Sequence, residues 1–116
     1  MLDLLDPDQL RETLIRARDA ALTANRGGAD DGGTCNFDSA VMHVPKADVP
    51  IVRAAAEGIG VRVAVGDWLC GSEQAAVFLS ADGARGQADA NTRAARALCD
   101  VLKEAGLPAM MFYQMD

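Results

Sequence analysis

The order of predicted elements after residue 36 most constrains what this chain can fold into. Four apolar segments, at 37–44, 61–65, 74–80 and 109–115, have the alternation or the buried-strand composition of β-strands. One helical pattern begins at Asp48 and Pro50 after the first strand, and a second one ends at Gly106 before the last strand. The predicted order after residue 36 is therefore βαββαβ.

A further helix is predicted ahead of this unit. Asp6 is suited to cap it and Pro7 to occupy its first position. Apolar residues then recur at helical spacing and form one stripe: Leu10, Leu14, Ala17, Ala21 and Leu22. We expect residues 1–116 to form a single domain, with the N-terminal helix in 1–26, a glycine-rich loop at 27–36 and the core in 37–116.

The βαββαβ order is that of the split βαβ pattern, so we predict an α+β, ferredoxin-like domain. Its antiparallel sheet would have the order 4-1-3-2, and the N-terminal helix would be an addition. In that topology the first and second strands begin at the end of the sheet where the third and fourth strands finish. The helix after the third strand also begins there. Polar residues far apart in sequence would meet at this end, which we call the loop end.

The loop end is the predicted ligand site. Its candidate residues are Thr34, Cys35, Asn36, Asp38, Arg85, Asn91, Thr92, Arg93, Tyr113 and Gln114. Arginines near a helix N-terminus favour an anion, the amides and hydroxyl offer neutral hydrogen bonds, and Tyr113 offers a stacking face. We therefore expect a small polar or anionic metabolite, and a nucleotide fits that description. The glycines match neither a P-loop nor the dinucleotide fingerprint.

Two other functions remain open from the sequence. The chain could be a protein-interaction module that docks through the N-terminal helix or the turn around Trp68. It could also be an enzyme with Cys35 as nucleophile, although the only histidine, His43, would lie near the opposite end of the same strand. No spacing of ligand residues indicates a metal site, and no motif indicates a cofactor.

Charge and cysteine content restrict the partners and the compartment. Acidic residues outnumber basic ones by 17 to 11, giving a net charge of −6, so double-stranded nucleic acid is not an expected partner. The three cysteines show no disulfide or zinc spacing, which is typical of a reducing compartment. With neither a signal peptide nor a long apolar run, a cytoplasmic protein without membrane contact is expected.

Both faces of the predicted sheet carry apolar residues. In the last strand, for example, Met110 and Phe112 alternate with Met111 and Met115. The two helices of a βαββαβ unit cover only one face of its sheet. We expect the N-terminal helix and a second copy of the chain, packed sheet to sheet, to cover the other face together, so the sequence predicts a homodimer.

Overall fold

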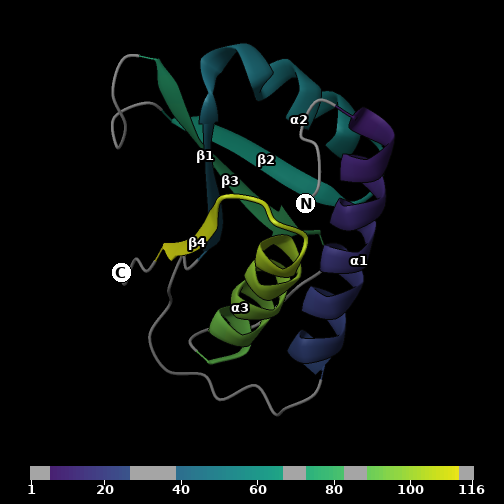
Figure 1. The fold of residues 1–116 in the computed structure, drawn as a ribbon. Helices are drawn as coiled ribbons and strands as arrows, with labels where there is room; N and C mark the ends of the chain where they lie inside the picture. The colour runs from purple at the N-terminus through teal and green to yellow at the C-terminus, as the bar shows by residue number, and fades with distance from the viewer. Residues whose placement is uncertain (1–5, 27–38, 67–72, 83–88, 113–116) are drawn as a thin grey trace.

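The computed structural model describes residues 6–26, 39–66, 73–82 and 89–112. Within them, a four-stranded antiparallel sheet packs with three α-helices, which confirms the predicted α+β class (Figure 1). The elements in chain order are α1 (Pro7–Arg26), β1 (Ser39–Pro45), the short 3₁₀ helix η1 (Lys46–Asp48), α2 (Val49–Ala56), β2 (Val61–Gly66), β3 (Gln74–Ala81), α3 (Asp89–Glu104) and β4 (Ala109–Phe112).

The strands lie in the order β2-β3-β1-β4, which reads β4-β1-β3-β2 from the opposite edge. Every neighbouring pair is antiparallel. Met42 in the centre of β1 lies opposite Val77 on one side and Ala109 on the other. Because side chains alternate along a strand, these residues share one face of the sheet. That face, which we call the helix face, holds the hydrophobic core.

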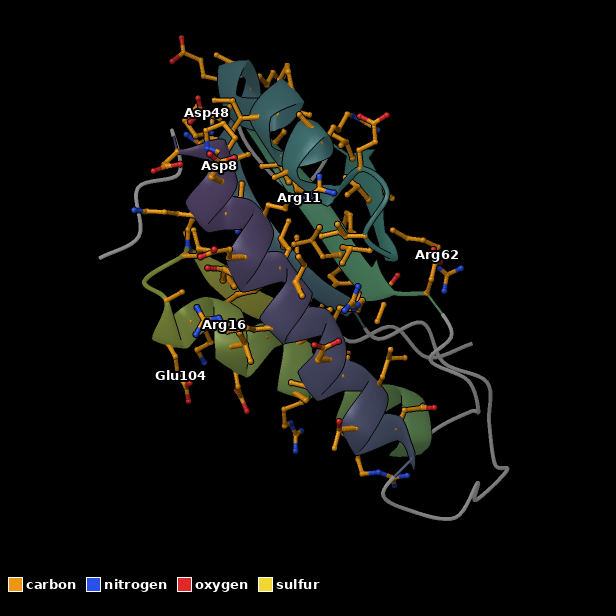
Figure 2. The ribbon with its side chains drawn as sticks, turned by 90° about the vertical axis from the view of Figure 1, so that its right-hand side faces the viewer. Asp8, Arg11, Arg16, Asp48, Arg62 and Glu104 are labelled. Carbon is orange, nitrogen blue, oxygen red and sulfur yellow. The ribbon has the colours of Figure 1, made fainter. Side chains whose placement is uncertain are left out.

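All three helices pack on the helix face. The core joins side chains of α1, α2 and α3 to the buried residues of the sheet. Helix α1 contacts both α2 and α3, and it also contacts β2 and β3 (Figure 2). The prediction that the N-terminal helix covers the other face of the sheet is therefore wrong. The four most buried apolar residues of its stripe, Leu10, Leu14, Ala17 and Ala21, are at most 1% exposed within this core.

The start of α1 and the end of α3 are fixed by local chemistry that the sequence predicts. Asp6 Oδ1 accepts hydrogen bonds from the backbone N–H groups of Asp8 and Gln9, at 3.1 and 3.3 Å, and so caps α1. Gly106 has a φ of 88°, the left-handed conformation that glycine adopts most readily. The N–H of Leu107 then bonds to the carbonyl of Leu102 at 3.0 Å, which closes a Schellman-type end on α3.

No helix in the described part of the chain combines the length and the hydrophobicity needed to cross a bilayer.

Candidate functional site

The predicted loop end of the sheet is where four strand ends meet. Ser39, the first residue of β1, lies opposite Phe112, the last residue of β4. Val61, the first residue of β2, lies opposite Ala81, the last residue of β3. The first residue of β1 and the last residues of β3 and β4 therefore lie at the same end of the sheet (Figure 1).

The start of α3 and the end of α1 are held together by one of the predicted site residues. Asn91, Thr92 and Arg93 lie in the first turns of α3, and the side chains of Thr92 and Arg93 are half-buried. Nε of Arg93 donates a hydrogen bond to the backbone carbonyl of Ala24, at 3.4 Å. Ala24 belongs to the last turn of α1, whose carbonyl groups lack partners within the helix. Arg93 therefore has a structural role that its position in the sequence does not reveal.

The other candidate residues lie outside the described part of the chain. They are Thr34, Cys35, Asn36, Asp38, Arg85, Tyr113 and Gln114. The structure therefore brings together the strand ends from which these residues continue, and it places three members of the predicted site on one of the neighbouring helices. Whether their side chains form one site stays a prediction.

The face of the sheet opposite the helices, here called the outer face, carries apolar residues, and two of its aromatic rings pack against each other. Val41 lies between Phe78 of β3 and Met110 of β4 in the register and is only 2% exposed. The rings of Phe78 and Phe112 meet edge to face, with centroids 5.3 Å apart and an interplanar angle of 78°. Among the described residues of this face, Met110 is the one large apolar residue that is strongly exposed, at 51%.

The two surfaces predicted for an interaction module have different outcomes. The apolar stripe of α1 is buried in the core of its own chain, so it does not offer a docking surface to another protein. The outward side of α1 carries charged and polar residues instead, among them Arg11, Glu12 and Arg16 (Figure 2). The turn around Trp68 lies outside the described residues.

Cys99 is the one cysteine in the described part of the chain, and its surroundings oppose a role as a nucleophile. It lies in α3, is 1% exposed and belongs to the hydrophobic core. Burial raises the pKa of its thiol, Asp100 adds to the rise and Lys103 opposes it. His43 projects from the outer face of the sheet, because it alternates with the core residues Met42 and Val44. These two residues therefore cannot form a nucleophile and base pair. Cys35 lies outside the description.

We expect iodoacetamide to modify Cys99 roughly a hundredfold more slowly in the folded protein than in urea at pH 8, because alkylation requires an exposed thiolate. Since the folded-state pKa is raised, the thiol remains protonated through its ordinary titration range and ionises only at higher pH. Peptide mass spectrometry after timed labelling measures the rate at each cysteine. Equal rates for Cys99 with and without urea would show that α3 is not packed as described.

The described residues contain no group of three or more His, Cys, Asp or Glu side chains that could hold a metal ion. Comparison with family models, with curated proteins and with solved structures finds no match for this chain.

Proposed function

We propose that this chain is a small binding domain of ferredoxin-like architecture that takes a small polar or anionic ligand at the loop end of its sheet, without catalysing a reaction. The observation that carries the proposal is the meeting of four strand ends, Ser39 with Phe112 and Val61 with Ala81. Polar residues that are distant in sequence continue directly from these ends. Ligand sites in small domains are commonly built from such loops on a rigid scaffold.

The ferredoxin-like assignment is supported by the element order βαββαβ after α1 and by a fully antiparallel sheet with β1 and β3 in the centre. Helix α1 modifies that architecture, because it packs against both of the unit's helices on the helix face. Its last turn consequently lies beside the start of α3, where Arg93 bonds to Ala24. In this proposal the extra helix forms one wall of the loop end.

The proposed roles of the residues follow from their chemistry. Arg85 would pair with the charge of the ligand, and Tyr113 would stack on a planar group. Thr34, Asn36 and Asn91 would exchange hydrogen bonds with the ligand. Arg93 is better suited to position the start of α3, since its guanidinium already donates to the end of α1.

Thermal unfolding in the presence of nucleotides, sugar phosphates and carboxylates tests the proposal. A compound at about a hundred times its Kd stabilises the folded state by about 2.7 kcal/mol. For a domain of 116 residues that corresponds to a rise in Tm on the order of 10 °C. We expect Arg85→Ala and Asn91→Ala to lower the affinity for that compound about tenfold or more, because each substitution removes a side chain that would form a hydrogen bond to the ligand.

Lys103→Ala is the matched control, because Lys103 is an exposed residue in the last turn of α3, at the other end of the helix. It should leave the ligand-induced rise in Tm unchanged. A compound that stabilises the wild type and both loop-end variants equally would contradict the assignment of the site. If no compound in the panel changes the Tm, the proposed class of ligand is wrong.

A further inference from the structure

Among the described strands, β2 forms one edge of the sheet, and every second residue of it turns its backbone groups away from β3. The N–H of Asp82 donates to the carbonyl of Gly60 at 2.8 Å, so these two residues form a hydrogen-bonded pair of the antiparallel ladder. The register makes Arg62 and Ser80 the next pair of this kind. Because backbone groups of alternate residues point to opposite sides of a strand, the groups of Arg62 and Ala64 face β3. Those of Val61, Val63 and Val65 consequently face outward, where no described strand pairs with them.

An open hollow of about 570 Å³ lies beside this edge, between β2 and α2. It is lined by Pro50, Arg53 and Ala54 of α2, by Glu57 directly after the helix, and by Val61 and Val63 of the strand, among others. Val65, the next residue of the same face of β2, is 37% exposed. The edge of the sheet and the apolar floor of the hollow thus form one continuous surface. We call this the β2 edge surface.

The charges on the β2 edge surface are self-complementary. Arg53 of α2 and Glu57, the residue that follows the last turn of α2, both line the hollow. Both are exposed, and neither forms an ion pair with a described residue. The backbone of Glu57 is extended, so Arg53 and Glu57 are not neighbours on successive turns of one helix. A two-fold axis that runs two α2 helices antiparallel would instead place Arg53 of one copy opposite the partner's Glu57, twice in the same contact.

The net charge of the chain also favours a matched contact of this kind. At −6 two copies repel one another over most relative orientations. Opposed charge pairs at the contact offset this repulsion in one orientation and fix the register. The outer face offers less, because Val41 at its centre is already buried and, in the described part of the chain, Met110 is its one strongly exposed large apolar residue.

We propose that two copies of this chain associate along their β2 strands, antiparallel, so that two four-stranded sheets become one continuous sheet. The outward N–H and C=O groups of Val61, Val63 and Val65 pair with those of the partner strand. The two α2 helices lie side by side across the axis, where they close the hollow, and Arg53 faces the partner's Glu57. This contact lies on a side edge of the sheet, so it does not depend on ligand binding at the loop end.

Sedimentation velocity of the full chain over a concentration series tests the proposal. The wild type is expected to dimerise, and Arg53→Glu or Glu57→Arg alone to raise the dimer dissociation constant about tenfold, because each creates two like-charge contacts. The double variant, with both charges exchanged, should recover the wild-type constant. The two single variants distinguish a direct charge pair from an effect of net charge, because Arg53→Glu makes the chain more acidic and Glu57→Arg makes it less acidic. A net-charge effect would change the dissociation constant in opposite directions, whereas a direct pair predicts that both single variants raise it.

A backbone substitution tests the strand pairing separately. Val65→Pro removes an outward N–H and leaves the hydrogen bonds to β3 intact, whereas Val65→Thr retains the N–H and the branched shape. The proline variant should be monomeric, with a circular dichroism spectrum like that of the wild type, and the threonine variant dimeric. A monomeric wild type, or a double charge variant that stays monomeric, would overturn the proposal. So would a dimer that dissociates with Met110→Lys, because that result would place the contact on the outer face.

Discussion

Replacement of Leu14 by alanine is expected to lower the free energy of unfolding by about 2–5 kcal/mol. Leu14 is fully buried in the middle of α1, in the core that this helix shares with α2, α3 and the sheet. Truncation to alanine loses the favourable free energy of burying the removed carbon groups. It also leaves a cavity, which the surrounding helices and sheet cannot fill because they are packed against one another. Domains of this size are commonly stable by 5–15 kcal/mol, so the loss is a large part of the total.

Urea unfolding followed by circular dichroism measures this loss, with Glu12→Ala as the matched control. Glu12 is an exposed residue of the same helix, two positions earlier, and its replacement should change the stability by no more than about 0.5 kcal/mol. Equal effects of the two substitutions would mean that α1 does not belong to the core.

The helices and strands could be predicted from the sequence because their limits depend on neighbouring residues. Asp6 caps α1 because its side chain accepts hydrogen bonds from the backbone N–H groups two and three residues later. Gly106 ends α3 because it adopts a positive φ directly after the last turn. Each of these signals acts within a few residues, so no knowledge of the tertiary structure is needed to interpret it.

The face of the sheet on which α1 packs could not be predicted in this way. Both faces of the central strands carry apolar residues, for example Met42 on one face and Val41 on the other. The apolar stripe of α1 is compatible with either. A contact that belongs to the observed arrangement joins Arg18 to Ile59: Nη1 donates to the backbone carbonyl at 2.7 Å, across 41 residues of sequence. No pattern within α1 itself indicates that partner.

The loop end shows the same division between local and distant information. The meeting of the strand ends follows from the order of elements and antiparallel pairing, so the sequence could predict it. The role of an individual side chain could not be predicted with the same ease. Arg93 suits an anion site by its position near a helix N-terminus, yet it donates to Ala24, which lies 69 residues away. Topology therefore locates a candidate site more reliably than it assigns the residues that contact a ligand.

A second large effect is expected from Ala17→Leu, which adds volume on the buried side of α1. Ala17 is fully buried in the core, and α1 contacts β2 and β3 directly. A small side chain in a close-packed core allows a helix to lie close to its neighbours, and the larger residue must displace α1 or adopt a strained rotamer. We expect a loss of about 1–3 kcal/mol in the free energy of unfolding.

The displacement of α1 also has a readout beyond stability. Arg18 follows Ala17 and bonds to the carbonyl of Ile59, so a shift of α1 should lengthen that bond and move the amide NMR signal of Gly60. Thr23→Leu adds a large apolar side chain at an exposed position of the same helix and should leave both the stability and that signal nearly unchanged. If Ala17→Leu were as stable as the wild type with an unmoved Gly60 signal, α1 could not lie directly on the sheet, and the wall that it forms at the loop end would be absent.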